Sequence, residues 1–263
     1  PNASDPNPTI NAVVVDPDGN NNLPASLNTG LIGRWDCETL VPIGSYHGFA
    51  DLAGNDQPVE CRSFSMSVDN SGMISKAALF DQEADHLSAA PSLVSGRTAF
   101  SVSMWFKLQN NYVQTKPTSI HTVFFAYNNA LDAYPEFFLT IYKGIAGSPN
   151  QKIVFNRYVG TSVVQDWTAE IPGGLYVDNA KWHHLSMVKN GANYRLFLNG
   201  VKIKDTAGTS GSWTATGTGY FCFGKGIPNG ISADHSFRGS MDRLRFYSRN
   251  LRGTEVSALY GQE

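Results

Sequence analysis

The sequence is poor in charge and in long hydrophobic runs, and both shortages narrow the functions it can have. Only 16% of the 263 residues are charged, the net charge is -2, and Lys and Arg never form a run. A nucleic-acid-binding surface needs a basic patch, so we expect no nucleic-acid partner. No apolar stretch approaches the roughly 20 residues that cross a bilayer, so membrane insertion is not expected either.

Cysteine is also scarce, and the three cysteines form no zinc-binding motif. Cys37 and Cys61 are 24 residues apart in a polar, loop-like region. A disulfide between them would stabilise the fold by roughly 3 kcal/mol and would indicate an oxidising, extracellular compartment. Two free thiols are the alternative. Cys222, in the apolar run YFCFG, is expected to be a small buried residue.

Signatures of catalysis are missing as well. The chain has no Gly-x-Ser-x-Gly nucleophile elbow and no P-loop, which leaves serine-esterase and NTPase activity without support. Strand patterns do not alternate with helical ones, so a parallel nucleotide-binding sheet is not expected.

The sequence instead contains many short runs in which apolar and polar residues alternate. In 99–108 (AFSVSMWFKL) every second residue from Phe100 to Leu108 is apolar, and Trp105 falls among the residues between them. This period of two predicts a β-strand with one face toward the core. Similar short apolar runs occur at 122–127, 136–143, 152–159, 183–189, 194–203, 219–225 and 241–248.

Turn signals separate these runs. Asn190-Gly191 and Asn199-Gly200 tolerate the positive φ of a tight turn and predict hairpins. Only 251–261 shows helical spacing. Many short strands with such turns predict an all-β fold, a sandwich or jelly roll of two antiparallel sheets with one short C-terminal helix.

The first 29 residues differ in composition from the rest of the chain. They are rich in Pro, Asn and Asp, which predicts an extended arm or linker, with the jelly-roll domain spanning 30–263. The apolar island INAVVV at 10–15 could pair as a strand with the edge of a sheet, in this subunit or in a neighbouring one.

Four blocks of the sequence point to a known family. They are KAALFDQEADHLSAAPSL (76–93), FSVSMWFKL (100–108), WHHLSMVKNGANYRLFLNGVKI (182–203) and FRGSMDRLRFYSRNLRGTEVSALYG (237–261). Their order resembles the laminin-G-like, or concanavalin A-like, lectin/glucanase jelly roll, whose central hairpin starts with Trp-His-His. The resemblance covers about 30–261 and implies the fold without a ligand, because lectins, adhesion modules, glycanases and lyases share it.

The resemblance also implies a structural calcium ion. Jelly rolls of this type often bind Ca²⁺ on the outer side of the sandwich, through a carboxylate on the closing strand and backbone carbonyls of the first strand. Asp242 in GSMDRLRFY matches the closing-strand position, and Asp36 in GRWDCE lies on the first strand. Asp81 and Asp85 are a second candidate pair. Carboxylate oxygens suit Ca²⁺, and the alternative is that these aspartates are solvated or form salt bridges.

A glycosidase would need two carboxylates about 5–10 Å apart across a sugar. Retaining glycosidases that share this fold carry Glu-x-Asp-x-x-Glu or a near variant, and this chain has neither. The nearest acids, Asp81, Glu83 and Asp85, coincide with the family's ordinary Phe-Asp segment. We therefore expect no catalytic residues.

The adjacent residues His183 and His184 invite a metal-site interpretation. Neighbouring side chains of a strand point to opposite faces, so the two rings cannot bind one ion side by side. His183 shares the parity of Leu185 and Met187 and is expected to be a hydrogen-bonded core residue. His184 would then lie on the outer face, as a candidate ligand contact.

A glycan site needs an aromatic platform surrounded by polar groups. In each strand the apolar residues at every second position are expected to face the core, so the residues between them point outward. Six such residues could share one concave outer face: Trp105, Asn156, Tyr158, His184, Arg243 and Arg245. Alternatively, a loop covers Trp105 and the arginines pair with acids. Aromatic residues expected in loops are further candidates: Tyr46, Tyr127, Tyr134, Trp167 and Trp213.

The sequence thus predicts a non-catalytic, extracellular binding domain, secreted or surface-displayed, that recognises a polysaccharide or glycoconjugate as a lectin or adhesion module. One alternative is a structural or adhesive subunit of a surface assembly, such as an appendage filament or virion coat, tethered through residues 1–29. Another is a polysaccharide-degrading enzyme with unfamiliar catalytic residues.

Overall fold

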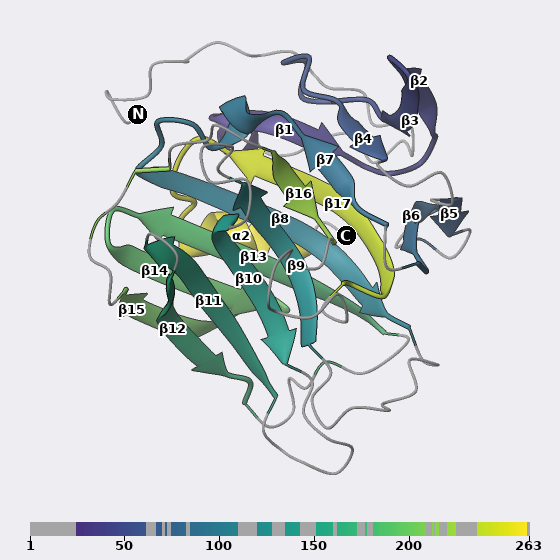
Figure 1. Cartoon of the computed structure of the whole chain (residues 1–263). Helices are drawn as coiled ribbons and strands as arrows, with labels where there is room; N and C mark the ends of the chain where they lie inside the picture. Colours follow the sequence, from purple (N-terminus) through teal and green to yellow (C-terminus); the bar gives the residue numbers. More distant parts are fainter. Residues whose placement is uncertain are drawn as a thin grey trace.

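The computed structural model describes residues 25–61, 67–69, 72, 75–82, 85–109, 120–127, 135–142, 151–159, 162–172, 177, 181–208, 212, 214–215, 220–224 and 236–261. Within these ranges the strands form two antiparallel sheets packed face to face (Figure 1). The predicted all-β sandwich is therefore confirmed.

Sheet A runs in the order β15 (Val201–Ala207), β14 (Asn193–Leu198), β13 (Trp182–Asn190), β8 (Ala99–Leu108), β17 (Gly239–Tyr247), β6 (Ala77–Phe80) and β5 (Ser67–Asp69), and β1 (Leu31–Trp35) also pairs with β17. Sheet B runs in the order β12 (Ser162–Glu170), β11 (Lys152–Val159), β10 (Pro135–Tyr142), β9 (Ile120–Tyr127), β16 (Phe221–Phe223), β7 (Leu87–Ala89), β4 (Val59–Cys61), β3 (Tyr46–Phe49) and β2 (Val41–Ile43). A 3₁₀ turn, η1 (Pro91–Leu93), and two helices, α1 (Ala25–Asn28) and α2 (Gly253–Gly261), complete the described elements.

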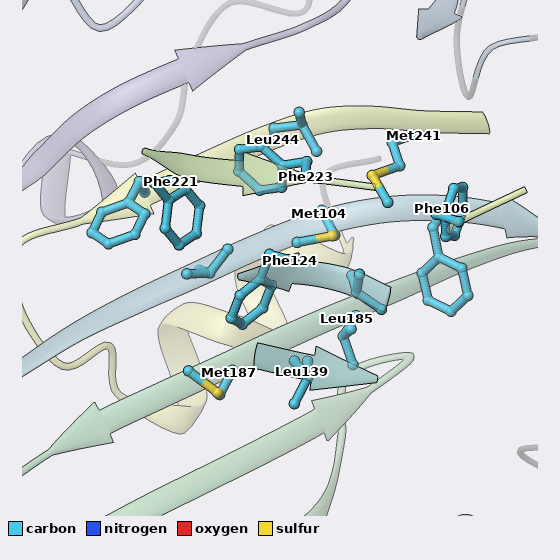
Figure 2. Close-up of a cluster of buried hydrophobic side chains, with 14 of the residues drawn as sticks. Met104, Phe106, Phe124, Leu139, Leu185, Met187, Phe221, Phe223, Met241 and Leu244 are labelled. Carbon is cyan, nitrogen blue, oxygen red and sulfur yellow. The ribbon is translucent and has the colours of Figure 1, made fainter. Parts of the chain in front are cut away.

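The core lies between the two sheets and consists of the apolar residues that occupy every second position of the strands. Strand β8 has the bounds that its alternation predicts, and its inward residues belong to the main buried cluster. Phe100 bridges the layers, because its ring stacks on Phe137 of sheet B and on Phe246 of sheet A at centroid distances of 5.6 and 5.5 Å. Figure 2 shows neighbouring core side chains converging from both sheets. Each buried phenylalanine contributes roughly 2–3 kcal/mol through the removal of its apolar surface from water.

The predicted hairpin turns adopt the backbone conformations that their sequences favour. Gly191, between β13 and β14, has φ of 60°. Between β14 and β15, Asn199 and Gly200 have φ of 50° and 73°. A Cβ at Gly200 would also lie only 2.8 Å from the ring of Tyr260, so this glycine allows α2 to approach the turn.

Helix α2 packs on the outer face of sheet A, the face that points away from sheet B (Figure 1). Its buried residues Val256 and Leu259 join Val188 of β13, Phe197 of β14 and Tyr247 of β17 in a second hydrophobic cluster. This face of the sandwich is therefore covered by the end of the chain.

The last residues of the predicted arm belong to the folded domain. Ala25–Asn28 form the short helix α1, and Leu27 is fully buried in the same cluster as α2. Arg249 fixes this segment by donating hydrogen bonds to the carbonyl oxygens of Ser26 and Thr29 at 2.7 Å each. The arm is thus helical rather than extended at 25–28, whereas the apolar island at 10–15 lies outside the described residues.

The predicted disulfide is not present in the structure. Cys37 and Cys61 are free thiols, and both are buried in the main core cluster, as is expected of small apolar residues. Burial, together with nearby carboxylates, raises the pKa of Cys37 well above its usual value and that of Cys61 to about 12. Cys222 is buried as predicted.

We therefore expect Ellman's reagent to react slowly with the native protein, because all three thiols are buried and the pKa of Cys37 and of Cys61 is raised. After unfolding in guanidinium chloride without reductant, it should detect all three thiols of each chain, and two in a Cys61→Ser variant. A single reactive thiol in the unfolded wild type would instead show that Cys37 and Cys61 are bonded.

Candidate functional site

The outer face of sheet A carries four of the predicted ligand-binding residues, and all four are buried. Trp105, His184, Arg243 and Arg245 are 4%, 0%, 2% and 1% exposed. The ring of Trp105 stacks on Tyr260 of α2 with centroids 5.7 Å apart. Parity correctly placed Trp105 on an outer face, but the expected open platform is absent because α2 covers it.

The two adjacent histidines point to opposite faces of β13, as the strand geometry requires. His183 packs against Phe106 in the core, with ring centroids 5.7 Å apart. His184 lies under α2, where its Nε2 is 2.9 Å from the hydroxyl of Ser103, which in turn accepts a hydrogen bond from Ser186. Burial, with a smaller contribution from Arg245, lowers the pKa of His184 to about 3. His184 is therefore a neutral, structural residue near pH 7.

The low pKa of His184 predicts a specific loss of stability in acid. In the unfolded chain this histidine takes up a proton near pH 6.5, whereas in the folded protein it stays neutral down to about pH 3. The free energy of unfolding should therefore fall as the pH drops through this window, by about 2 kcal/mol at about pH 5.

The measurement compares urea unfolding of the wild type and a His184→Gln variant across this pH range. Other acidic groups titrate in both proteins, so the difference between the two curves isolates His184. A constant difference between pH 7 and pH 4 would mean that His184 takes up its proton in the folded protein at the same pH as in the unfolded chain.

The aspartates predicted to bind calcium are engaged in contacts within the protein. Asp36 and Asp242 are 2% and 1% exposed. Both oxygens of Asp36 accept hydrogen bonds from Arg34, and Oδ1 of Asp242 accepts one from the backbone N–H of Arg243. The ion pair of Asp36 with Arg34 matches the salt-bridged alternative for this aspartate.

The second candidate pair organises a turn. Oδ2 of the buried Asp85 accepts hydrogen bonds from the backbone N–H groups of Asp81, at 2.9 Å, and Gln82, at 2.8 Å. Asp81 itself is exposed, and Glu83 lies outside the described residues. Across the part of the chain that the structure describes, no group of three or more His, Cys, Asp or Glu side chains could hold a metal ion.

The outer face of sheet B holds the other two predicted ligand-binding residues, Asn156 and Tyr158. Because Phe155 and Ile153 of β11 face the core, Asn156 and Tyr158 point away from it. Asn156 is 6% exposed and Tyr158 is half-buried. The structure therefore divides the predicted platform between two sheets, with only these two residues on the face opposite α2.

The neighbouring strand β10 adds three residues to this face. Phe138, Thr140 and Tyr142 alternate with core residues, and Phe138 is opposite Asn156 in the antiparallel register. The rings of Phe138 and Tyr158 lie 6.1 Å apart at 45°. At the other end, Nζ of Lys152 lies 5.2 Å from the ring centre of Tyr142, a cation–π contact. We call these residues the β10–β11 strip: Phe138, Thr140, Tyr142, Lys152, Asn156 and Tyr158.

The strip combines buried and accessible groups. Phe138 and Thr140 are 2% and 1% exposed, whereas Tyr142, Lys152 and Tyr158 are half-buried. The rings of the two tyrosines are therefore partly accessible from outside, whereas the residues between them are buried. The alternation in 136–143 could have placed the β10 residues on a common face, but only the register across β10 and β11 brings them beside Asn156 and Tyr158.

The aromatic residues expected in loops lie in different parts of the structure. Trp167 lies on β12 and is a core residue, because its ring stacks on Phe155 at 5.6 Å. Tyr46 begins β3 and is half-buried. Tyr127 ends β9, and nothing is described of its side chain, whereas Tyr134 and Trp213 lie outside the described residues.

None of the helices in the described part of the chain is long and apolar enough to span a membrane.

Solved structures with a similar fold include several binding domains. Domain 4 of an extracellular GH43 arabinanase from Geobacillus stearothermophilus, solved with arabinotriose, is 18% identical, with a TM-score of 0.58, and the match covers 88% of this chain and 98% of that one. The binding domain of Paraclostridial Mosquitocidal Protein 1 is 17% identical, with a TM-score of 0.60 and coverage of 89% and 52%. The binding domain of botulinum neurotoxin serotype D is 14% identical, with a TM-score of 0.61 and coverage of 90% and 52%.

These likenesses concern the fold, and the chain spans about half the length of the two toxin domains. A search of curated protein sequences finds no match. The model of one family, described as the concanavalin A-like lectin/glucanases superfamily, matches residues 81–257. This match covers more than half of the chain and agrees with the two-sheet sandwich, so the chain belongs to the concanavalin A-like lectin/glucanases superfamily.

Proposed function

We propose that this domain is a non-catalytic, extracellular binding module that recognises a polysaccharide or glycoconjugate through the β10–β11 strip. The observation that carries the proposal is the arrangement of Tyr142 and Tyr158, two half-buried tyrosines on one outer sheet face, with the half-buried Lys152 beside Tyr142. Binding sites commonly combine aromatic surface with a few well-placed polar groups.

The chemistry of the strip suits a sugar chain. The C–H face of a pyranose or furanose ring is apolar and packs on an aromatic ring, while its hydroxyl groups need hydrogen-bonding partners. Tyr158 and Tyr142 offer rings and phenolic hydroxyls, and Lys152 adds a donor at the edge. Tyr158 and Tyr142 are at opposite ends of the paired segment, so the strip suits an extended oligosaccharide better than a single sugar.

Glu136 and Glu170, at the two ends of the strip, are too far apart to be the carboxylate pair of a glycosidase. Glu170 is opposite Lys152 on β11, whereas Glu136 precedes Phe137, which is opposite Arg157. Glu136 is therefore about six residues along the sheet from Glu170, which corresponds to about 20 Å, well beyond the roughly 5–10 Å that the two carboxylates of a glycosidase require. These two residues cannot act together as a glycosidase pair.

The similar structures support the same class of function without naming a ligand for this chain. Two of them are binding domains of toxins, and the arabinanase domain was solved with an oligosaccharide. Since the sequence identities are 14–18%, the site itself has to be tested on this protein.

A glycan array is the appropriate test. We expect the wild-type protein to bind a restricted set of oligosaccharides, and a Tyr142→Ala/Tyr158→Ala double variant with an unchanged circular dichroism spectrum to lose that binding. Tyr220→Ala is the matched control, because Tyr220 is 47% exposed and lies outside the strip. The proposal fails if no glycan binds, or if the double variant keeps the wild-type binding profile.

A further inference from the structure

Five buried charged residues gather on the outer face of sheet A, where β1 meets β17. Arg34, Asp36, Asp242, Arg243 and Arg245 are each between 1% and 3% exposed, and we call them the arginine–aspartate cluster. Arg34 is opposite Arg245 in the β1–β17 register. The resemblance to calcium-binding jelly rolls implied a metal ion at this location.

Both oxygens of the Asp36 carboxylate already accept hydrogen bonds from an arginine. Nε of Arg34 donates to Oδ1 at 3.2 Å, and Nη2 of the same guanidinium donates to Oδ2 at 2.5 Å. Burial alone would raise the pKa of Asp36, but Arg245, Arg34 and Arg243 together lower it below its usual value. Asp36 is therefore an ionised carboxylate whose charge is balanced by guanidinium groups.

The backbone of β17 also forms hydrogen bonds within this cluster. The pairing of β17 with β8 shifts between Asp242 and Arg245, which marks a β-bulge, and Arg243 within it has φ of 48°. A non-glycine residue in this conformation costs on the order of 1 kcal/mol or more and needs compensating contacts. Two such contacts are the hydrogen bonds from the N–H of Arg243 to Asp242 Oδ1 at 2.7 Å and from Arg245 Nη1 to the carbonyl oxygen of Arg243 at 3.2 Å.

These contacts use the groups that would have to coordinate calcium. Ca²⁺ takes six to eight oxygen ligands, and a site on this face would draw on the carboxylates of Asp36 and Asp242 and on nearby carbonyl oxygens. Three guanidinium groups already outnumber two carboxylates in the cluster. A divalent cation would add further positive charge in a buried region, where electrostatic repulsion is poorly screened.

We infer that the three arginines take the place of a metal ion and that the arginine–aspartate cluster binds no Ca²⁺. The guanidinium groups balance the buried carboxylates and hold the bulge of β17 against β1. The stability of this domain should consequently depend on the arginines and not on calcium at this site.

The test measures thermal unfolding and calorimetric titration of the full chain with Ca²⁺ and with EDTA, in the wild type and in Asp36→Asn and Asp242→Asn variants. We expect neither additive to shift the melting temperature and no heat of Ca²⁺ binding. A Ca²⁺ effect that persists in both variants would come from elsewhere and would agree with the inference. A Ca²⁺ effect that either variant abolishes would overturn it.

A second measurement covers the case in which the aspartate variants do not fold. Trp105 is opposite Asp242 in the β8–β17 register, so it would sensitise the luminescence of a Tb³⁺ ion bound in the cluster. We expect a Trp105→Phe variant to leave any terbium emission of the protein unchanged. Saturable emission that is lost in this variant would show that the cluster holds a metal.

Discussion

Replacing Arg34 by Met is expected to lower the free energy of unfolding by about 3–5 kcal/mol, because the change leaves a buried carboxylate without its main partner. Asp36 is 2% exposed and receives both of its arginine hydrogen bonds from this side chain. Methionine fills a similar volume, so the loss reflects charge rather than a cavity. Chemical denaturation in urea, with its midpoint and slope compared between the two proteins, gives this value.

The exposed ion pair on β15 provides a matched control. Nζ of Lys202 lies 2.6 Å from Asp205, but the two side chains are 49% and 52% exposed. Lys202→Met should therefore change the free energy of unfolding by less than about 1 kcal/mol. If Arg34→Met costs no more than this control, Asp36 is solvated and the proposed role of the arginine–aspartate cluster is wrong.

Replacing Tyr158 by Ala is expected to weaken binding of a glycan identified on the array by about tenfold to thirtyfold, which corresponds to about 1.4–2 kcal/mol. Tyr158 is half-buried, so the ring already has a fixed orientation and loses little side-chain entropy when a ligand packs on it. Isothermal titration calorimetry with the purified oligosaccharide measures the change.

Three comparisons separate a binding role from a structural one. Tyr158→Phe keeps the ring and should retain most of the affinity, whereas Tyr220→Ala should leave it unchanged. The melting temperature of Tyr158→Ala should fall by only a few degrees. An unchanged dissociation constant for Tyr158→Ala would place the site away from the β10–β11 strip.

The fold was largely predictable because its signals are local. The alternation in 99–108 gave the bounds of β8, and Asn-Gly pairs gave the turns at 190–191 and 199–200. The helix at the end of the chain was also predicted within two residues of its start. Each of these features depends on neighbours a few residues apart, which a sequence displays directly.

The site was less predictable because it depends on which elements cover each sheet. Parity placed both Trp105 and Tyr158 on outer faces, but it could not assign them to different sheets. The alternation within one strand also does not show that Tyr260, which is far along the chain, stacks on Trp105. The pairing of Arg34 with Asp36 is local, two residues apart on one face, and could have been expected from the same alternation.

The disulfide prediction failed for a similar reason. Spacing alone gave a plausible loop between Cys37 and Cys61, but a long-range contact decides whether two thiols bond. Both side chains lie in the hydrophobic core, where a free cysteine packs well as a small apolar residue.

Hydrogen–deuterium exchange with and without a bound oligosaccharide shows whether the outer face of sheet B is the binding surface. Binding at this face should protect peptides that cover 135–142 and 152–159 and leave exchange unchanged in peptides from β13 and α2. Protection confined to β13, β17 or α2, with none in β10 and β11, would contradict it and return the site to the face of sheet A that α2 covers.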